Sequence, residues 1–226
     1  MEPYDKMYQM IDKIVQYPFP HVIIDNFLEP VYANKMYEEF YCYEDEIWEE
    51  KGKLFINEHA KKKYLTNERY FPNSFNYFLS IVKSKTFMSM LERRFGFENI
   101  IFDDNMYGAG MQIAKNGSHL SPHIDFNYNS DLGAYRCLNL LFYLNKGWAE
   151  HFGGSLQFYD NEMKIKSIVP KYNRCAIFAT TNKSFHGHNE IKHPENINRK
   201  SFNVYYYIKK PINEISKKPH KTIWRK

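Results

Sequence analysis

Hydrophobic residues recur every three or four positions in three stretches of the first hundred residues, a spacing typical of helices that bury one face. This pattern predicts helices over residues 7–15, 30–40 and 74–95. A short apolar run at residues 21–25 predicts a buried strand between the first two helices. Residues 44–72 mix runs of charge with scattered aromatics, and we expect them to be irregular.

After residue 100 the pattern changes to short apolar runs that are separated by turn residues. We predict strands over residues 106–114, 119–126, 135–144, 155–159, 164–169, 174–179, 183–188 and 199–208. The gaps between these strands are too short for crossover helices, so the strands should pair antiparallel. Many short antiparallel strands in about a hundred residues favour a sandwich or a barrel.

The fold class that follows is α+β, with a double-sheet β core and helices packed against it. No internal repeat or low-complexity linker divides the chain, so we predict one domain over residues 1–208. Its helical part covers residues 1–99, and its β core covers residues 100–208. Residues 209–226 follow as a basic C-terminal tail.

The composition is that of a folded globular protein, with 43% hydrophobic and 25% charged residues. Aromatic residues reach 18%, which suits strands around a bulky core. The three widely spaced cysteines offer no disulfide framework, and the polar N-terminus is unlike a secretory signal. No apolar stretch is long enough to cross a membrane. We therefore expect a cytoplasmic protein that is not secreted and has no membrane partner.

Positive charge is concentrated at the C-terminal end. The whole chain has 31 Lys or Arg and 26 Asp or Glu, and residues 209–226 contain seven of the former and one of the latter. Such a tail is typical of weak contact with nucleic acid, ribosomes or acidic surfaces, or it only adds solubility. A third interpretation is that the apolar Ile223 and Trp224 dock the tail back onto the domain.

The first candidate site is a pair of potential metal ligands, His123 and Asp125, on one predicted strand. Residues two apart on a strand face the same side of the sheet. Alone, such a pair is more often a hydrogen-bonded structural histidine than a metal site. His186 would complete two histidines and one carboxylate, the facial triad of non-haem Fe(II) oxygenases. His188 lies on the same face as His186 and competes with it as the third ligand.

A second candidate site is formed by Arg199 and Ser201, which alternate on the last predicted strand. A guanidinium offers a planar fork that matches a carboxylate, and a nearby hydroxyl adds another donor. The pair therefore predicts a carboxylate anchor. Without the three candidate metal ligands, an ion pair at the rim of the fold would be the simpler interpretation of Arg199.

Six segments then occur in order along the chain: HID (123–125), RCLNLLFYLNKGW (136–148), FGGSLQFYD (152–160), PKYNRCAIF (170–178), SFHGH (184–188) and RKSFNVYYY (199–207). In these segments the chain resembles the 2-oxoglutarate and Fe(II)-dependent dioxygenases, most closely their prolyl 4-hydroxylase-like branch. The resemblance covers residues 106–208. A looser likeness to that branch appears in YPFPHVIIDNFLEP (17–30).

The resemblance implies a double-stranded β-helix, or jelly-roll, with the metal at one mouth of the barrel. It implies that His123, Asp125 and His186 bind Fe(II). Arg199 would bind the distal carboxylate of the cosubstrate, 2-oxoglutarate. Ascorbate is implied as an optional further cofactor.

Three more residues match cosubstrate contacts of the family. Tyr143 stands where related hydroxylases place a tyrosine that donates to the distal carboxylate, and Asn139 lies four residues earlier on the same strand. Ser201 completes an Arg-x-Ser pattern that is found in parts of the superfamily. The chain departs from the closest hydroxylases upstream of the first ligand, where Gln112 or Ile113 replaces a tyrosine.

The activity that the resemblance implies is hydroxylation of a C–H bond, coupled to decarboxylation of 2-oxoglutarate to succinate and CO₂. The favoured substrate is a prolyl residue in a peptide or protein. The metal ligands do not encode the substrate, so a small molecule, a sugar or a nucleobase is an alternative. A non-catalytic jelly-roll binding module is the alternative of another class. Nucleic-acid or ribosome contact through the basic tail is a further one.

Overall fold

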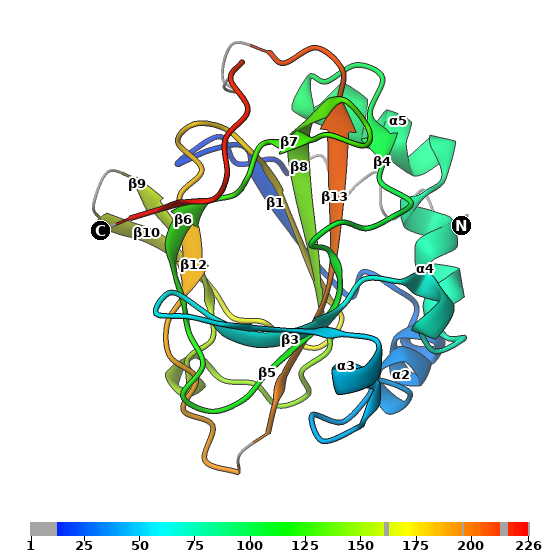
Figure 1. The fold of residues 1–226 in the computed structure, drawn as a ribbon, viewed down its shortest axis with the longest axis vertical. Helices are drawn as coiled ribbons and strands as arrows, with labels where there is room; N and C mark the ends of the chain where they lie inside the picture. Colours follow the sequence, from blue (N-terminus) through cyan, green and yellow to red (C-terminus); the bar gives the residue numbers. More distant parts are fainter. Residues whose placement is uncertain (1–12, 161–162, 196, 213–216, 226) are drawn as a thin grey trace.

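The computed structural model describes residues 13–160, 163–195, 197–212 and 217–225. Two antiparallel sheets face each other, and helices cover the outer side of the larger sheet (Figure 1). The predicted helix over residues 7–15 lies largely outside the described residues. Within these ranges, no helix combines the length and the apolar character needed to cross a bilayer.

The larger sheet has nine strands in the described part of the chain. They are β1 (His21–Asp25), β2 (Lys53–Ile56), β3 (Lys61–Leu65), β4 (Ile101–Phe102), β5 (Gly110–Ala114), β7 (Tyr128–Asn129), β8 (Ala134–Tyr143), β11 (Arg174–Ala179) and β13 (Arg199–Ile208). The main order is β1-β11-β8-β13-β5-β3-β2, with β4 beside β13 and β7 beside β8. The long strands β8 and β13 therefore lie at the centre of this sheet.

The smaller sheet has five strands within the same ranges. They are β6 (Leu120–Ile124), β9 (Leu156–Asp160), β10 (Met163–Ile168), β12 (His186–His188) and β14 (Ile223–Trp224), in the order β10-β9-β12-β6-β14. The chain crosses repeatedly between the two sheets, as expected of a jelly-roll. An aromatic cluster that includes Phe158 of β9 and Phe178 of β11 joins the sheets, with 5.2 Å between the two ring centroids.

The helices are α2 (Pro30–Glu38), α3 (Ile47–Glu50), α4 (Phe75–Val82) and α5 (Lys85–Phe95), with short 3₁₀ turns at Glu68–Tyr70 and Glu150–Phe152. The single helix predicted over residues 74–95 is thus two helices. The break is at Ser84, whose backbone is extended and whose hydroxyl accepts from the N–H of Phe87 at 3.1 Å. A serine in this conformation caps the start of a new helix.

Helix α4 packs its aromatic face against the centre of the larger sheet (Figure 1). The Phe78 ring lies 5.0 Å from Phe142 of β8 and 5.3 Å from Phe202 of β13, measured between centroids. Phe75 also lies 5.2 Å from Phe202. Burying side chains of this size stabilises the fold by roughly 2–3 kcal/mol each. The helices therefore close the outer face of the sheet and leave its other face for the space between the sheets.

The eight strands predicted after residue 100 each overlap an observed strand. The prediction that residues 44–72 are irregular is wrong, because this segment forms α3, β2 and β3. Lys63 of β3 is buried and its ammonium lies 2.5 Å from Glu49 of α3. The charge runs in this segment thus include an ion pair between a buried lysine and an exposed glutamate, which links β3 to α3.

Candidate metal centre and cosubstrate pocket

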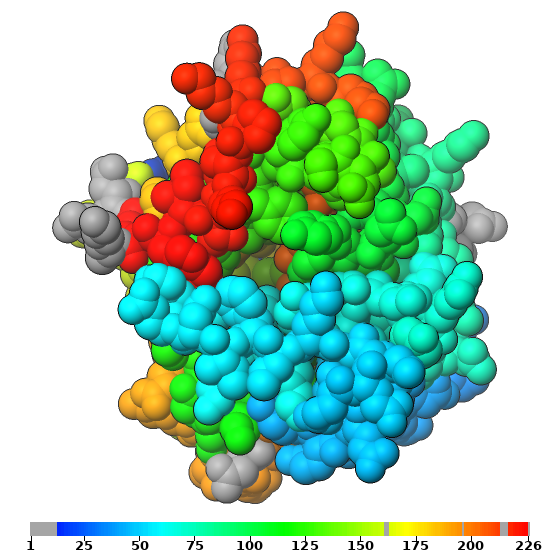
Figure 2. Space-filling model, in the orientation of Figure 1, coloured from blue at the N-terminus to red at the C-terminus, as the bar shows by residue number. Residues whose placement is uncertain are grey.

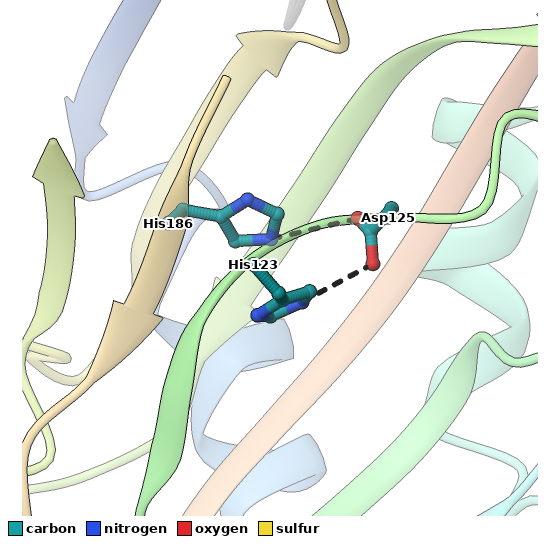
Figure 3. Close-up of side chains that lie close together, drawn as sticks. All are labelled: His123, Asp125 and His186. Carbon is teal, nitrogen blue, oxygen red and sulfur yellow. Dashed lines mark ion pairs between the residues drawn. The ribbon is translucent and has the colours of Figure 1, made fainter. Parts of the chain in front are cut away.

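Three potential metal ligands come together between the two sheets. His123 of β6 and His186 of β12 are direct partners across these neighbouring strands. Asp125 lies just past the end of β6 at Ile124. One ligand atom from each of the three side chains lies within 4.8 Å of the other two. Figure 3 shows both imidazole rings turned toward the carboxylate.

Each histidine ring is held with its Nε2 toward the shared point. The Nδ1–H of His123 donates to the Ser121 carbonyl and that of His186 to the Ser184 carbonyl, both at 2.9 Å. Because a carbonyl only accepts, these bonds leave the Nε2 lone pairs free for a metal. The two Nε2 atoms lie 3.3 and 3.5 Å from the carboxylate oxygens of Asp125. This donor set, with both tautomers fixed, fits Fe(II).

The larger sheet holds the Asp125 carboxylate in place. Asn139 Nδ2 donates to Oδ2 at 2.6 Å, and an Arg136 terminal nitrogen lies 3.0 Å from the same oxygen. Burial raises the pKa of Asp125, but the charges of Arg136 and His186 outweigh it and place the pKa well below its usual value. The carboxylate is therefore ionised at neutral pH, as a metal ligand must be. Asn139, predicted as a cosubstrate contact, lies beside this candidate ligand.

Arg136 is a buried residue of the site that sequence reasoning missed. Its guanidinium carbon lies 3.8 Å from the ring centroid of Phe126 and 3.7 Å from that of Tyr205. Arg136 and Asn139 are three residues apart on β8, so regular alternation would place them on opposite faces. The pairing of β8 with β13 shifts register past Cys137, and this bulge returns Arg136 to the face of Asn139.

The third ligand is better assigned to His186 than to His188. Burial lowers the pKa of His186 to about 4, and the charge of His123 acts in the same direction, so the ring is neutral at pH 7. His188 also lines the cavity, but among the described residues it is not part of the converging group. Burial and the charge of Arg199 hold the pKa of His188 well below its usual value.

Arg199 is buried at the start of β13 and lines the same cavity. Its Nε donates to the Gly154 carbonyl at 2.7 Å. Gly154 has a φ of +65°, and a Cβ at this position would lie 3.0 Å from Cδ of Arg199. Glycine therefore allows the backbone to approach the arginine closely. With Nε fixed in this way, the terminal nitrogens can meet a carboxylate as a fork.

A row of polar side chains crosses the larger sheet beside Arg199. Ser201 of β13 lies directly opposite Tyr143 of β8 and Gln112 of β5, and all three line the cavity. The Tyr143 hydroxyl is buried and finds no hydrogen-bond partner in the described part of the chain. Burial raises the pKa of Tyr143, so the hydroxyl remains a donor. A guanidinium beside a buried hydroxyl without a partner fits the distal carboxylate of 2-oxoglutarate.

The candidate metal ligands and Arg199 line one cavity of about 340 Å³, a volume typical of small-molecule sites. Figure 2 shows a hollow where the β2–β3 hairpin (cyan) faces the C-terminal segment, residues 217–225 (red). Seven aromatic side chains contribute to the lining: Phe55, Tyr64, Tyr107, Phe126, Tyr143, Tyr205 and Trp224. The cavity thus combines a polar interior with an aromatic lining.

Lys62 of β3 places a further cation in this cavity, and sequence reasoning also missed it. Its Nζ donates to Gln112 Oε1 at 2.8 Å. Burial lowers the pKa of Lys62 to about 8, and the charge of Asp125 partly opposes this shift. Most molecules therefore carry this positive charge at pH 7. In the structure the side-chain amide of Gln112 thus accepts a hydrogen bond from a lysine of the β2–β3 hairpin.

The C-terminal segment, residues 217–225, is docked on the domain. Its strand β14 pairs antiparallel with β6, and Trp224 lies opposite His123. The Trp224 ring centroid is 4.9 Å from that of His123 and 4.5 Å from that of His59, with which it is stacked. Of the three interpretations of the tail, the one in which Ile223 and Trp224 dock onto the domain describes residues 217–225.

Side chains of the domain hold the rest of this segment. Asn127 Nδ2 donates to the Lys218 carbonyl at 3.0 Å, and Asn127 Oδ1 accepts from the N–H of His220 at 2.8 Å. At the other end, the Arg225 guanidinium carbon lies 4.2 Å from the ring centroid of Phe185. The segment is therefore fixed on both sides of Trp224.

Replacing Trp224 by alanine is expected to lower the free energy of unfolding by about 1–2 kcal/mol, because two ring contacts of roughly 0.5–1.5 kcal/mol each are lost. Urea denaturation followed by circular dichroism measures this change. Ile223→Ala is the matched control, since Ile223 is 44% exposed and should change stability by less than about 0.5 kcal/mol. Equal stabilities of Trp224→Ala and the wild type would contradict a stabilising role for the docked segment.

Two facing antiparallel sheets with two histidines, a carboxylate and an arginine in one cavity define a metal-dependent oxygenase of the jelly-roll type. Sequence comparison leads to the same class. Residues 109–207 match the sequence profile described as the 2OG-Fe(II) oxygenase superfamily. This part of the chain is similar to that superfamily, whose cofactors are Fe(II) and 2-oxoglutarate, and the converging His123, Asp125 and His186 fit Fe(II).

Solved structures of prolyl hydroxylases share the fold. A prolyl hydroxylase from Trichoplax adhaerens, in complex with a peptide fragment of the hypoxia inducible factor oxygen degradation domain, superposes with a TM-score of 0.64 at 20% identity over 90% of both chains. A prolyl-4-hydroxylase from Pseudomonas putida has a TM-score of 0.64 at 15% identity, covering 88% of this chain and 98% of its own. The predicted jelly-roll is consistent with this likeness.

The same fold also occurs in an enzyme of different activity. The epimerase SnoN, in complex with Fe³⁺, alpha ketoglutarate and nogalamycin RO, has a TM-score of 0.56 at 9% identity, covering 91% of this chain and 84% of its own. Comparison with curated protein sequences gave no significant match. These likenesses show the fold alone, and the substrate has to be argued from the site.

Proposed function

We propose that this chain is a 2-oxoglutarate- and Fe(II)-dependent dioxygenase that hydroxylates a prolyl residue in a peptide or protein. The observation that carries the reaction type is the convergence of His123, Asp125 and His186 in the cavity that also contains Arg199. Metal ligands and a carboxylate anchor have no structural reason to share a cavity unless both are used.

Different residues of the cavity would bind the metal and the cosubstrate. His123, Asp125 and His186 would hold Fe(II), and Arg199 with Tyr143 would hold the distal carboxylate of 2-oxoglutarate. When bound, these cofactors supply oxidation of a C–H bond by O₂, coupled to formation of succinate and CO₂. The buried walls of the cavity exclude water from the reacting atoms.

The aromatic lining supports a prolyl substrate. Tyr107 is 59% exposed, and Phe126 stands beside it with 5.4 Å between the ring centroids. Aromatic walls of this kind bind proline-containing segments, whose rings are apolar and whose backbone is already ordered. The likeness to prolyl hydroxylases, one of them solved with a peptide, supports the same substrate class.

The test is mass spectrometry of proline-containing peptides after incubation with the iron-loaded protein, 2-oxoglutarate and O₂. We expect one added oxygen per modified peptide and an equal amount of succinate. Matched peptides with alanine in place of proline are the control. Succinate that forms only with a sugar, a nucleoside or another small molecule would retain the reaction type and reject the peptide substrate. Absence of any succinate would reject the enzyme in favour of a binding module.

A further inference from the structure

Lys62 is a cation in the cavity without an acidic partner. Its hydrogen bond goes to the neutral amide of Gln112, and it forms no ion pair with a described residue within 4.0 Å. Asp125, the acidic group with the largest effect on Lys62, already pairs with Arg136. The other neighbour of the ammonium is the Tyr64 ring, whose centroid lies 6.0 Å away. A shielded ammonium with only neutral neighbours costs free energy unless an anion joins it.

Lys62 lines the cavity that also contains the candidate metal ligands and Arg199. Among the charged groups around it, Asp125 and Arg199 have the largest effects on its pKa. Gln112, which holds the ammonium, is in the polar row with Ser201 and Tyr143. The lysine is therefore beside the space that 2-oxoglutarate would occupy.

The charges in the cavity also favour a carboxylate of 2-oxoglutarate beside Lys62. Arg199 can neutralise one carboxylate of 2-oxoglutarate, and its second carboxylate must lie toward the metal ligands. A second cation next to Gln112 gives the second carboxylate a partner of its own.

We propose that Lys62, held by Gln112, binds the carboxylate of 2-oxoglutarate that Arg199 does not bind. This inference rests on the proposed function, because it needs 2-oxoglutarate as the cosubstrate. It goes beyond that function, because it assigns the cosubstrate two cations, one for each carboxylate. The β2–β3 hairpin thereby becomes part of the cosubstrate site.

Binding measurements with Zn(II)-loaded protein test this role without turnover. Lys62→Met keeps the length of the side chain and removes its charge. We expect the dissociation constant for 2-oxoglutarate to rise at least ~10-fold, the effect of losing one charge-assisted hydrogen bond. Binding of 2-oxobutyrate, which has the near carboxylate and lacks the distal one, should weaken by a similar factor. Lys53→Met is the matched control, because Lys53 lines the same cavity but is exposed.

The affinity for Zn(II) itself separates this role from a structural one. Removing a nearby positive charge should leave Zn(II) binding unchanged or make it tighter, while 2-oxoglutarate binding becomes weaker. Loss of both affinities in Lys62→Met would overturn the proposal, because it would mean that the pocket is damaged. Unchanged 2-oxoglutarate binding, alone or with a raised KM for the peptide, would also overturn it. Failure of the wild type to bind 2-oxoglutarate would instead reject the proposed function.

Discussion

Replacing His186 by alanine is expected to weaken Fe(II) binding by more than ~100-fold and to abolish succinate formation. His186 supplies one of the two imidazole nitrogens of the converging group, and its bond to the Ser184 carbonyl fixes the tautomer that binds metal. Loss of an outer partner of a metal ligand already costs ~10- to 100-fold in affinity or activity, so loss of the ligand should cost more. Anaerobic titration with Fe(II) measures the affinity directly.

The control for this variant is His188→Ala. His188 is on the same strand, faces the same cavity and is also buried. We expect its Fe(II) affinity to stay within a few-fold of the wild type, because its ring is not in the converging group. Circular dichroism confirms that both variants fold. Loss of Fe(II) binding in His188→Ala with retention in His186→Ala would reverse the assignment of the third ligand.

The sequence predicted the two histidines of the site because strand pairing follows simple rules. His123 and Asp125 stand two residues apart on a predicted strand and so share a face, and the resemblance in SFHGH indicated His186 as the third ligand. Their direct pairing across β6 and β12 turns two positions 63 residues apart into neighbours. Arg199 and Ser201 could be placed for the same reason, since alternation on β13 is regular there.

Arg136 could not be placed because its strand is not regular. The rule of alternation assigns it to the face opposite Asn139, and the bulge at Cys137 reverses that assignment. A bulge depends on the pairing partner, here β13, and leaves little signal in one strand's own sequence. The sequence therefore did not reveal Arg136 as the partner that keeps Asp125 ionised, although a buried carboxylate needs such a partner.

Lys62 and Trp224 were missed as site residues for a different reason. Both lie in polar, charged segments. The sequence therefore predicted an irregular segment around Lys62 and a basic tail around Trp224. In the structure β3 pairs with β5 and β14 pairs with β6, so each segment becomes an edge of the sheets around the cavity. Tertiary pairing of this kind overrides local composition. A lysine and a tryptophan then face the site from outside the regions that carry the family resemblance.

Replacing Arg199 by methionine is expected to raise the dissociation constant for 2-oxoglutarate at least ~100-fold, equivalent to about 3 kcal/mol. The variant removes a buried partner of a carboxylate, and truncating one member of such a pair costs about 2–5 kcal/mol. Fe(II) and Zn(II) affinities should be unchanged, because Arg199 is not among the converging ligands. Calorimetric titration of the Zn(II)-loaded protein with 2-oxoglutarate measures the effect. Arg174→Met, which removes an ion pair with Asp25 outside the cavity, is the matched control.

A second ligand decides whether Arg199 acts on the carboxylate or through the backbone. Its Nε also holds the Gly154 carbonyl, so its loss could disturb the loop beside the cavity. The ligand 2-oxobutyrate lacks the distal carboxylate, and we expect Arg199→Met to bind it as well as the wild type does. Equal weakening of both ligands would mean that Arg199 only supports the loop at Gly154, and the assignment of the carboxylate anchor would then be wrong. Because Lys62→Met should weaken both ligands and Arg199→Met only one, the pair of variants assigns each cation to its own end of the cosubstrate.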